Sequence, residues 1–455
     1  MTAMVPFDQE IVIGYDAQGE VVDWCSPKLN NFNGLFMGTS GSGKTWTLRQ
    51  MIARVYRRGT TFHILDVKGD FMPDNFAKMG LSSHVSEHDF NIISFSYFEG
   101  GSSLNPLQVP RSQEGGGVVM TIENAKELVY MFNRKLGPKQ ISYLGEVLKA
   151  VYADFKIDHE DESTWSNPAP TFADVYEKLT LIYQCIASGL DSGSVGSIMS
   201  EIGRAKRKAI KDIRKGREEE QDEDSIALGC QETAANAAEV IAGIVKSQLT
   251  FESLERNGTG EEWEHWSKET VYSLRDTINQ MVESRLFTGE MSKVMPGKIN
   301  VYDMTNISSA HQQIMMEIIA RRTFAMGVLN TKKTGNADPK FASHILVCDE
   351  GKHAKAISKQ PLSPVNRIAT EGRGFGVGVW MGVQQPDQVT QDQLRNFAFY
   401  FLLKTPESSS KEMQRMFTLK PNQLKLLEFR ENCLYSAGQK LSLIHISEPT
   451  RLLSI

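Results

Sequence analysis

One segment limits the possible folds of this chain more than any other. Gly38-Thr-Ser-Gly-Ser-Gly-Lys-Thr45 fits the pattern G-x-x-x-x-G-K-[ST]. The apolar run 34–37 precedes it with strand character, and residues 46–56 follow it with helical character. A strand, a glycine-rich loop and a helix in this order bring backbone N–H groups and the positive helix N-terminus around a phosphate chain. The segment predicts a phosphate-binding loop; the alternative is a glycine-rich turn without a ligand.

The loop also predicts which groups contact the nucleotide. Lys44 is expected to reach the β- and γ-phosphates, which makes it a candidate catalytic residue, and the Thr45 hydroxyl is expected to ligate Mg²⁺. The expected cofactors are therefore ATP and Mg²⁺. The residues expected to surround the nucleotide are Gly38, Thr39, Ser40, Gly41, Ser42, Gly43, Lys44, Thr45 and Trp46.

A second apolar run ends in two adjacent carboxylates. Residues 344–348 have the character of a buried strand, and Asp349 and Glu350 follow directly. Many strands end in an acidic turn, so this run alone is a weak signal. Together with the phosphate-binding loop it has the form of a Walker B segment. Asp349 is then expected to hold Mg²⁺ through water, and Glu350 to polarise the water that attacks the γ-phosphate.

Two further polar side chains are candidates for the same site. Gln384 follows the strand-like run 376–383, where it could contact the γ-phosphate; the alternative is a strand-terminal turn with a satisfied amide. Arg373 lies in a glycine-rich stretch before that run, where it could reach the phosphates of a neighbouring subunit; the alternative is a surface arginine. The residues alone leave both choices open.

Composition excludes several classes of protein. The chain has 455 residues and a net charge of −5, so any contact with DNA must be local. Its five cysteines include no C-x-x-C, which favours a reducing compartment over disulfides or a zinc site. We expect no membrane span and no signal peptide, and therefore a cytoplasmic protein that reaches a membrane only through a partner. His63 and His344 lack metal-ligand spacing and are expected to be structural.

The order of these segments carries a resemblance to a known family. The loop, the Asp349–Glu350 pair and Gln384 occur in the order typical of the HerA–FtsK superfamily of hexameric DNA-pumping ATPases, which includes conjugation and type IV secretion ATPases. Four further segments are similar to segments of this family: residues 11–20, the D-x-x-G-[DE] turn within 65–70, and residues 296–303 and 371–386. The resemblance covers 11–108 and 296–436. It implies that Arg373 acts on a neighbouring subunit and that Gln384 senses the γ-phosphate. Gly374 departs from the family, which usually has a basic residue there.

The resemblance implies a fold and a function. The expected fold class is α/β, a RecA-like P-loop NTPase core with a mainly parallel sheet and a large all-helical insertion. The expected function is a ring-forming motor, a homo-hexamer that couples ATP hydrolysis to movement of duplex DNA, with a nuclease or a membrane complex as a further partner. One alternative is a conjugation or type IV secretion ATPase that energises transfer through a membrane complex. The other is a nucleotide-gated assembly scaffold with little hydrolysis.

The pattern of strands and helices predicts five segments. They are a hairpin lead-in at 1–33, the first part of the core at 34–110, an all-helical insertion at 111–295, the second part of the core at 296–440, and a tail at 441–455. The tail begins LSLIHISEPTR, which resembles the translation of a transposase-type sequencing adapter. We interpret it as non-native; the alternative is a genuine terminal strand.

Overall fold

The computed structural model groups the chain into two compact units. The first comprises residues 1–106, 112–115 and 285–455, and the second comprises 107–111 and 116–284. The residues that the structure describes are 11–16, 18–24, 29–56, 59–110, 116–188, 201–213, 223–248, 263, 265–287, 289, 293–335, 339–350, 363–389, 391–429, 432–437 and 440–445. The five-segment division expected from the sequence remains a proposal.

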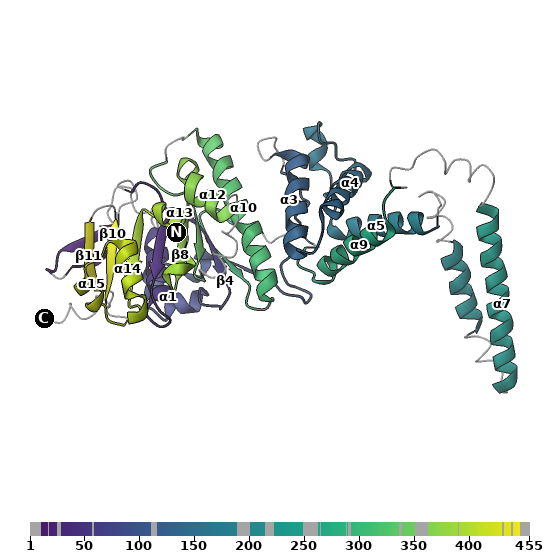
Figure 1. Ribbon diagram of the computed structural model, residues 1–455, viewed down its shortest axis with the longest axis horizontal. Coiled ribbons are helices and arrows are strands. Elements are labelled where there is room, and N and C mark those ends of the chain that lie inside the picture. Colours follow the sequence, from purple (N-terminus) through teal and green to yellow (C-terminus); the bar gives the residue numbers. More distant parts are fainter. Residues whose placement is uncertain are drawn as a thin grey trace. The chain divides into compact units, whose positions relative to one another are not determined.

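The first unit is built on a nine-stranded sheet in the order β11-β10-β9-β3-β8-β7-β4-β6-β5, with β1 and β2 forming a separate hairpin (Figure 1). The strands are β1 (Ile11–Tyr15), β2 (Val21–Trp24), β3 (Gly34–Met37), β4 (Thr61–Asp66), β5 (Phe90–Ser94), β6 (Ile299–Asp303), β7 (His344–Cys348), β8 (Val377–Val383), β9 (Phe399–Leu402), β10 (Asn432–Ala437) and β11 (Lys440–His445).

Helices connect these strands. The α-helices of this unit are α1 (Lys44–Tyr56), α2 (Pro73–Ala77), α10 (Ser309–Thr334), α12 (Pro364–Glu371), α13 (Gln391–Arg395), α14 (Ser410–Phe417) and α15 (Pro421–Lys425). The 3-10 turns are η2 (Leu81–Ser83), η3 (Glu87–Asp89), η6 (Gly372–Phe375), η7 (Pro386–Gln388) and η8 (Glu407–Ser409). Helix α10 begins after Ser308, whose hydroxyl accepts the His311 N–H, and ends at Gly335 with φ 66°.

The sheet is mainly parallel, as the sequence predicted. Strands β9, β3, β8, β7, β4, β6 and β5 pair in parallel, and only β10 and β11 pair antiparallel at one edge. The expected α/β fold class is confirmed. Strand β10 was not predicted from the sequence. The order places β8 between β3, which leads into the phosphate-binding loop, and β7, which leads into the acidic pair.

The central strands are covered on both faces, as parallel strands require. Phe62 and Ile64 of β4 pack in one core cluster with Leu48 and Ile52 of α1, while the alternate residue His63 is equally buried. Helix α10 contacts β7, β4 and β8 (Figure 1). Trp380 of β8 is fully buried within an aromatic group, and its indole N–H donates to the Phe32 carbonyl at 3.1 Å. This packing fixes the strands whose carboxyl ends carry the candidate site.

A chain of three polar side chains crosses the middle of the sheet. His63 Nδ1 lies 3.1 Å from the Tyr302 hydroxyl, and His63 Nε2 lies 3.0 Å from His344 Nδ1. Each contact needs one proton, so two neutral rings satisfy both hydrogen bonds. Burial lowers the pKa of His344 to about 4, and burial together with His344 lowers the pKa of His63. An added proton is disfavoured because it would place a positive charge on a buried ring.

This arrangement predicts a loss of stability in mild acid. The unfolded chain binds a proton at His344 near pH 6.5, whereas the folded chain binds it only near pH 4. The stabilisation is therefore complete above pH 6.5 and is lost as the pH falls toward 4. For this residue alone the free energy of unfolding should decrease by about 3 kcal/mol. Urea unfolding between pH 7 and 4 measures it. His344→Gln should reduce this pH dependence, and the exposed control His88→Gln should not. Equal slopes in both variants would contradict the assignment.

In the part of the second unit that the structure describes, every regular element is a helix (Figure 1). Its elements are α3 (Gly117–Phe132), α4 (Pro138–Asp154), η5 (Glu162–Ser166), α5 (Phe172–Ser188), a helix over 201–213, α7 (Glu223–Gln248) and α9 (Lys268–Glu283). Helix α5 packs against α9, and the rings of Tyr143 and Trp266 stack at 3.7 Å. The predicted all-helical insertion is therefore part of the confirmed fold.

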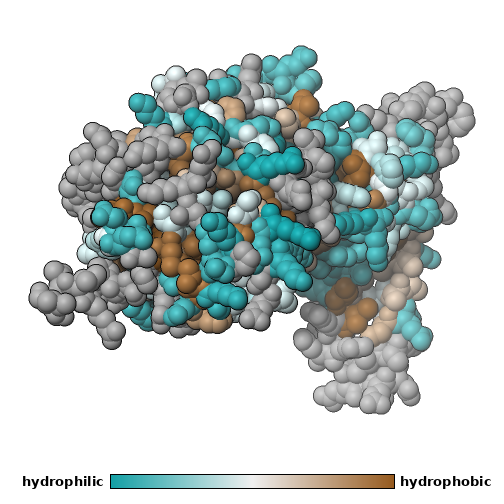
Figure 2. Space-filling model, turned by 60° about the vertical axis from the view of Figure 1, so that its left-hand side comes forward, coloured by the Kyte–Doolittle hydropathy of each residue, from teal (hydrophilic) through white to brown (hydrophobic). Residues whose placement is uncertain are grey.

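On the face in Figure 2, hydrophobic side chains form separate patches among hydrophilic ones. Within the described part of the chain, every helix is too short or too polar to cross a bilayer.

The expected non-native tail begins inside a strand. Residues 440–445 form β11, which pairs antiparallel with β10 in the register Ser436↔Leu441. The segment 446–455 lies outside the described residues. The interpretation of 441–455 as adapter-derived stays a prediction.

Candidate nucleotide-binding site

The loop between β3 and α1 has a backbone that only glycine adopts easily. Gly41 has φ 78° and Gly43 has φ 104°, both in the left-handed region. A Cβ at Gly38 would lie 2.5 Å from Ser42 Oγ and 2.8 Å from Leu403 Cβ. These contacts explain the glycines of the pattern. They also fix the loop where α1 begins at Lys44, so the N–H groups of its first turn point toward the loop.

The loop is tied to the carboxyl ends of two strands. The Gly38 N–H donates to the Val383 carbonyl at 3.1 Å, and the Thr39 N–H donates to the Lys404 carbonyl at 2.9 Å. The Lys44 ammonium donates to the Gly38 and Thr39 carbonyls at 2.8 and 3.0 Å. Burial lowers the pKa of Lys44, and the neighbouring carboxylates Asp349 and Glu350 oppose that change. Lys44 is therefore held at the mouth of the loop.

The acidic pair lies directly opposite the loop. The Thr45 hydroxyl donates to Asp349 Oδ2 at 2.6 Å, although 304 positions separate the two residues. Asp349 Oδ1 is buried and has no hydrogen-bond partner among the described residues. Burial raises the pKa of Asp349, and the Thr45 hydroxyl and Lys44 counteract it. A Cβ at Gly382 would meet Asp349 Oδ1 at 2.3 Å, so this glycine of β8 leaves room for the carboxylate.

These oxygens fit a magnesium site. Mg²⁺ is held in proteins by one or two carboxylates together with substrate phosphates and water. The Thr45 hydroxyl and the two Asp349 oxygens, one of them without a partner, provide that chemistry at one point of the loop. We therefore keep Thr45 and Asp349 as the proposed metal residues.

A pocket of about 530 Å³ joins the loop to the acidic pair. It contains most of the residues expected from the sequence. Its lining residues are Ser40, Gly41, Gly43, Lys44, Thr45, Trp46, Arg49, Lys68, Asp70, Asp349, Glu350 and Gln384. Gly38, Thr39 and Ser42 shape the loop without being among them. The roles of all these residues in binding and catalysis remain proposals.

Three lining residues were not singled out from the sequence. Arg49, one turn into α1, lies 3.4 Å from Asp70 and 5.8 Å from the centre of the Phe71 ring. Lys68 and Asp70 come from the turn after β4, and Lys68 forms an ion pair with Glu350. One signal in the sequence could have found Lys68 and Asp70, because residues 65–70 resemble a turn of the family. The carboxyl ends of parallel strands share one edge of the sheet, so a turn after such a strand lies at the same edge as the acidic pair.

Arg373 lies elsewhere in the first unit. It is an exposed residue of η6, and its guanidinium donates to the Asn30 carbonyl. It is not among the described residues that line the pocket. A role for Arg373 therefore requires a second subunit, as the sequence analysis expected, and this role stays a prediction.

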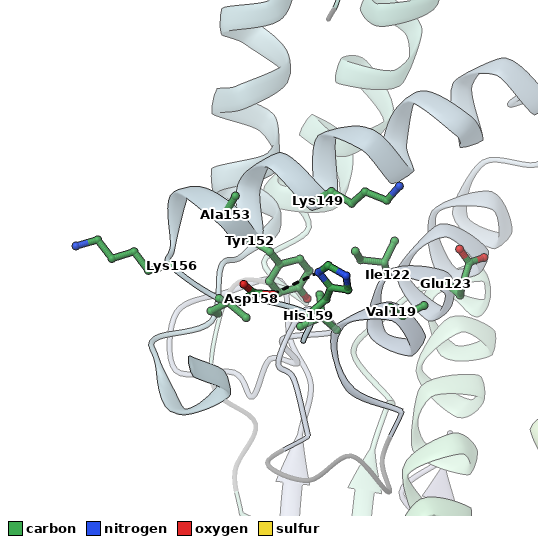
Figure 3. Close-up of a pocket in the computed structure, with 11 residues that line it drawn as sticks. Val119, Ile122, Glu123, Lys149, Tyr152, Ala153, Lys156, Asp158 and His159 are labelled. Carbon is green, nitrogen blue, oxygen red and sulfur yellow. Dashed lines mark ion pairs between the residues drawn. The ribbon is translucent and has the colours of Figure 1, made fainter. Parts of the chain in front are cut away.

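A larger cavity, of about 700 Å³, lies in the helical unit (Figure 3). Apolar side chains of α3 and α4, including Val119, Ile122 and Tyr152, line it together with charged residues at its rim. The Tyr152 hydroxyl already donates to the Leu107 carbonyl at 2.6 Å, and His159 pairs with Asp158 at 3.4 Å. These two polar side chains of the cavity therefore already have partners. The smaller pocket is the one that brings phosphate-binding and acidic groups together.

Comparison with known proteins supports the same segment. The family model for the type IV secretion-system coupling protein DNA-binding domain matches residues 26–84. The predicted resemblance is confirmed. The matched residues include the phosphate-binding loop, α1 and the turn that carries Lys68. A search of curated proteins finds no match.

Two solved structures resemble this chain at low sequence identity. VirB4 of Thermoanaerobacter pseudethanolicus matches with a TM-score of 0.58 and 15% identity, over 98% of this chain and 98% of that chain. The bacterial conjugative coupling protein TrwBdeltaN70, in its unbound monoclinic form, matches with a TM-score of 0.49 and 12% identity, over 97% and 90%. At such identity the match to VirB4 establishes a common fold, which extends through the helical unit.

Proposed function

We propose that this chain is an ATP-hydrolysing motor of the conjugation and type IV secretion kind, and that it acts on DNA. The observation that carries the proposal is the pocket in which the phosphate-binding loop, Asp349, Glu350 and Gln384 meet. The description of the family model that matches 26–84 supports DNA as the substrate. The fold shared with VirB4 supports the secretion branch.

The geometry suggests how the residues would act. Loop N–H groups and Lys44 would bind the phosphates, and Thr45 and Asp349 would hold Mg²⁺. Bound Mg²⁺ would neutralise charge on the phosphate oxygens. Glu350 would accept a proton from the attacking water as the bond between the γ-phosphorus and the bridging oxygen breaks. Gln384, at the end of β8, would contact the γ-phosphate.

A ring of identical subunits would complete the site. Arg373 lies outside the pocket of its own chain, so a neighbouring subunit would receive it. We propose a homo-hexamer with duplex DNA in its central channel. Its contact with a membrane, or with a nuclease, would run through another protein, and the chain itself would act in the cytoplasm.

The expected result is ATP hydrolysis that duplex DNA accelerates severalfold. The measurement is phosphate release by the purified full chain, with and without a DNA duplex long enough to pass through the central channel. Because DNA binding depends on phosphate contacts, the acceleration should weaken when salt rises from about 50 to 200 mM. Hydrolysis that ignores DNA would overturn the DNA motor and favour a protein-transfer ATPase. Absence of hydrolysis would overturn both in favour of a nucleotide-gated scaffold.

A further inference from the structure

Glu350, the proposed catalytic carboxylate, has an ion-pair partner in this structure. The Lys68 ammonium forms an ion pair with Glu350 Oε1, across the pocket from the loop. The Glu350 side chain is 7% exposed, whereas the Lys68 side chain is 54% exposed. A carboxylate that is almost buried depends on its partner, because an uncompensated charge in that position is costly. Glu350 therefore needs Lys68, or a substitute for it.

The turn that carries Lys68 is rigidly built. Asp66 Oδ1 accepts the N–H groups of Lys68, Gly69 and Asp70 at 3.1, 2.8 and 3.1 Å, and Asp66 Oδ2 accepts the Phe71 N–H at 2.9 Å. Gly69 has φ 77°, which suits glycine. The backbone of Lys68 is thus fixed at the pocket, and only its flexible side chain can move.

The other cations of the pocket are held more firmly. Lys44 donates to two loop carbonyls, and Arg49, whose side chain is 14% exposed, lies against Asp70 and Phe71. Among the described residues, Lys68 has one ion pair, and its aliphatic stem is largely exposed to solvent. Of these three cations, it can change partner at the lowest cost.

We propose that Lys68 is a positioning residue that holds Glu350 until the terminal phosphate of a nucleoside triphosphate takes its ammonium. In the ion pair, Glu350 Oε1 is occupied by the Lys68 ammonium, which makes the carboxylate a weaker acceptor for a proton from water. A γ-phosphate at the pocket offers Lys68 a stronger acceptor and leaves that oxygen free. A diphosphate lacks this group, so the pair persists. This inference rests on the proposed function. It makes Glu350 available as a proton acceptor only when a γ-phosphate is bound.

The test compares two probes, the β,γ-methylene analogue of ATP and ADP, bound to the full chain with Mg²⁺ and measured by calorimetry. Lys68→Ala should lower the ratio of triphosphate to diphosphate affinity about tenfold, chiefly through the triphosphate. Lys68→Arg, which keeps the charge, should retain most of the ratio. Lys78→Ala, an exposed lysine on the same unit, is the matched control and should change nothing.

A second variant detects the exchange itself. Glu350→Gln removes the competing carboxylate, so the triphosphate should bind more tightly and ADP should not. In the double variant Lys68→Ala/Glu350→Gln this gain should disappear, which is a non-additive result. The double variant also avoids an unpaired buried carboxylate, so it folds even if Lys68→Ala does not.

The outcomes separate this inference from the proposed function. If Lys68→Ala weakens both probes equally, or if the two substitutions are additive, Lys68 only supports the turn and the exchange is wrong. If the probes bind as expected but ATP is not hydrolysed, the motor proposal fails and the exchange stands. If neither probe binds the unmodified chain, both are overturned.

Discussion

Glu350→Gln is expected to retain ATP binding, tightened by the loss of the carboxylate that competes for Lys68, and to lower the rate of hydrolysis by about 10²–10⁴-fold. The amide keeps the size of the side chain at the end of β7, but it cannot accept a proton from water. Glu350 is 7% exposed beside Lys68, so the substitution also removes a buried charge without opening a cavity. Phosphate release and binding of radiolabelled ATP, measured on the same preparation, separate the two effects.

The control for this variant is Glu87→Gln, at an exposed glutamate of η3 that is not among the residues lining the pocket. It should hydrolyse ATP at the unmodified rate. Turnover by Glu350→Gln within a few-fold of the unmodified chain would remove Glu350 from its proposed role. The proton acceptor would then have to be sought among the other lining residues.

Lys44→Ala is expected to weaken ATP binding about 10²–10³-fold and to abolish hydrolysis at ordinary ATP concentrations. The Lys44 ammonium lies within 3.0 Å of two loop carbonyls and is the cation closest to the loop glycines. Its removal would take away the charge-assisted hydrogen bonds that we propose Lys44 makes to the β- and γ-phosphates. Titration with a fluorescent ATP analogue measures the affinity, and thermal unfolding checks that the chain still folds.

Lys78→Ala again provides the comparison, since this lysine is exposed and follows the short helix α2. It should bind the analogue like the unmodified chain. If Lys44→Ala bound ATP normally while folded, the loop would be a glycine-rich turn and not a phosphate site, and the assignment of the whole pocket would fail.

The sequence predicted the chemistry that depends on local pattern. The loop glycines have to adopt positive φ, so their spacing identified the turn, and the apolar run before Asp349 identified a buried strand that ends at the same sheet edge. Gln384 was predicted by the same reasoning, because it directly follows the apolar strand β8. The helical insertion was predicted because apolar residues recur there with helical spacing.

The remaining features depend on contacts between distant residues. Lys68 looks like any turn lysine until Glu350 is placed across from it, and that placement depends on the strand order β8-β7-β4. The neighbours of strand β10 in the sheet are β9 and β11, so pairing and not propensity defines it. His63 and His344 were expected to be structural, but only the sheet register brings their rings together.

The interleaved order of the strands has a consequence for how the chain folds during its synthesis. Nearly all of the second unit is encoded by one continuous segment of the sequence, 116–284, whereas β3 pairs with β8 and β9, which lie more than three hundred positions later. During synthesis the helical unit can therefore fold on its own while the first three strands of the sheet still wait for their neighbours. Nucleotide can be captured only by a nearly finished polypeptide, and its binding then favours the last assembly step. A ribosome stalled before β8 would hold a chain that has its phosphate loop but cannot retain ATP.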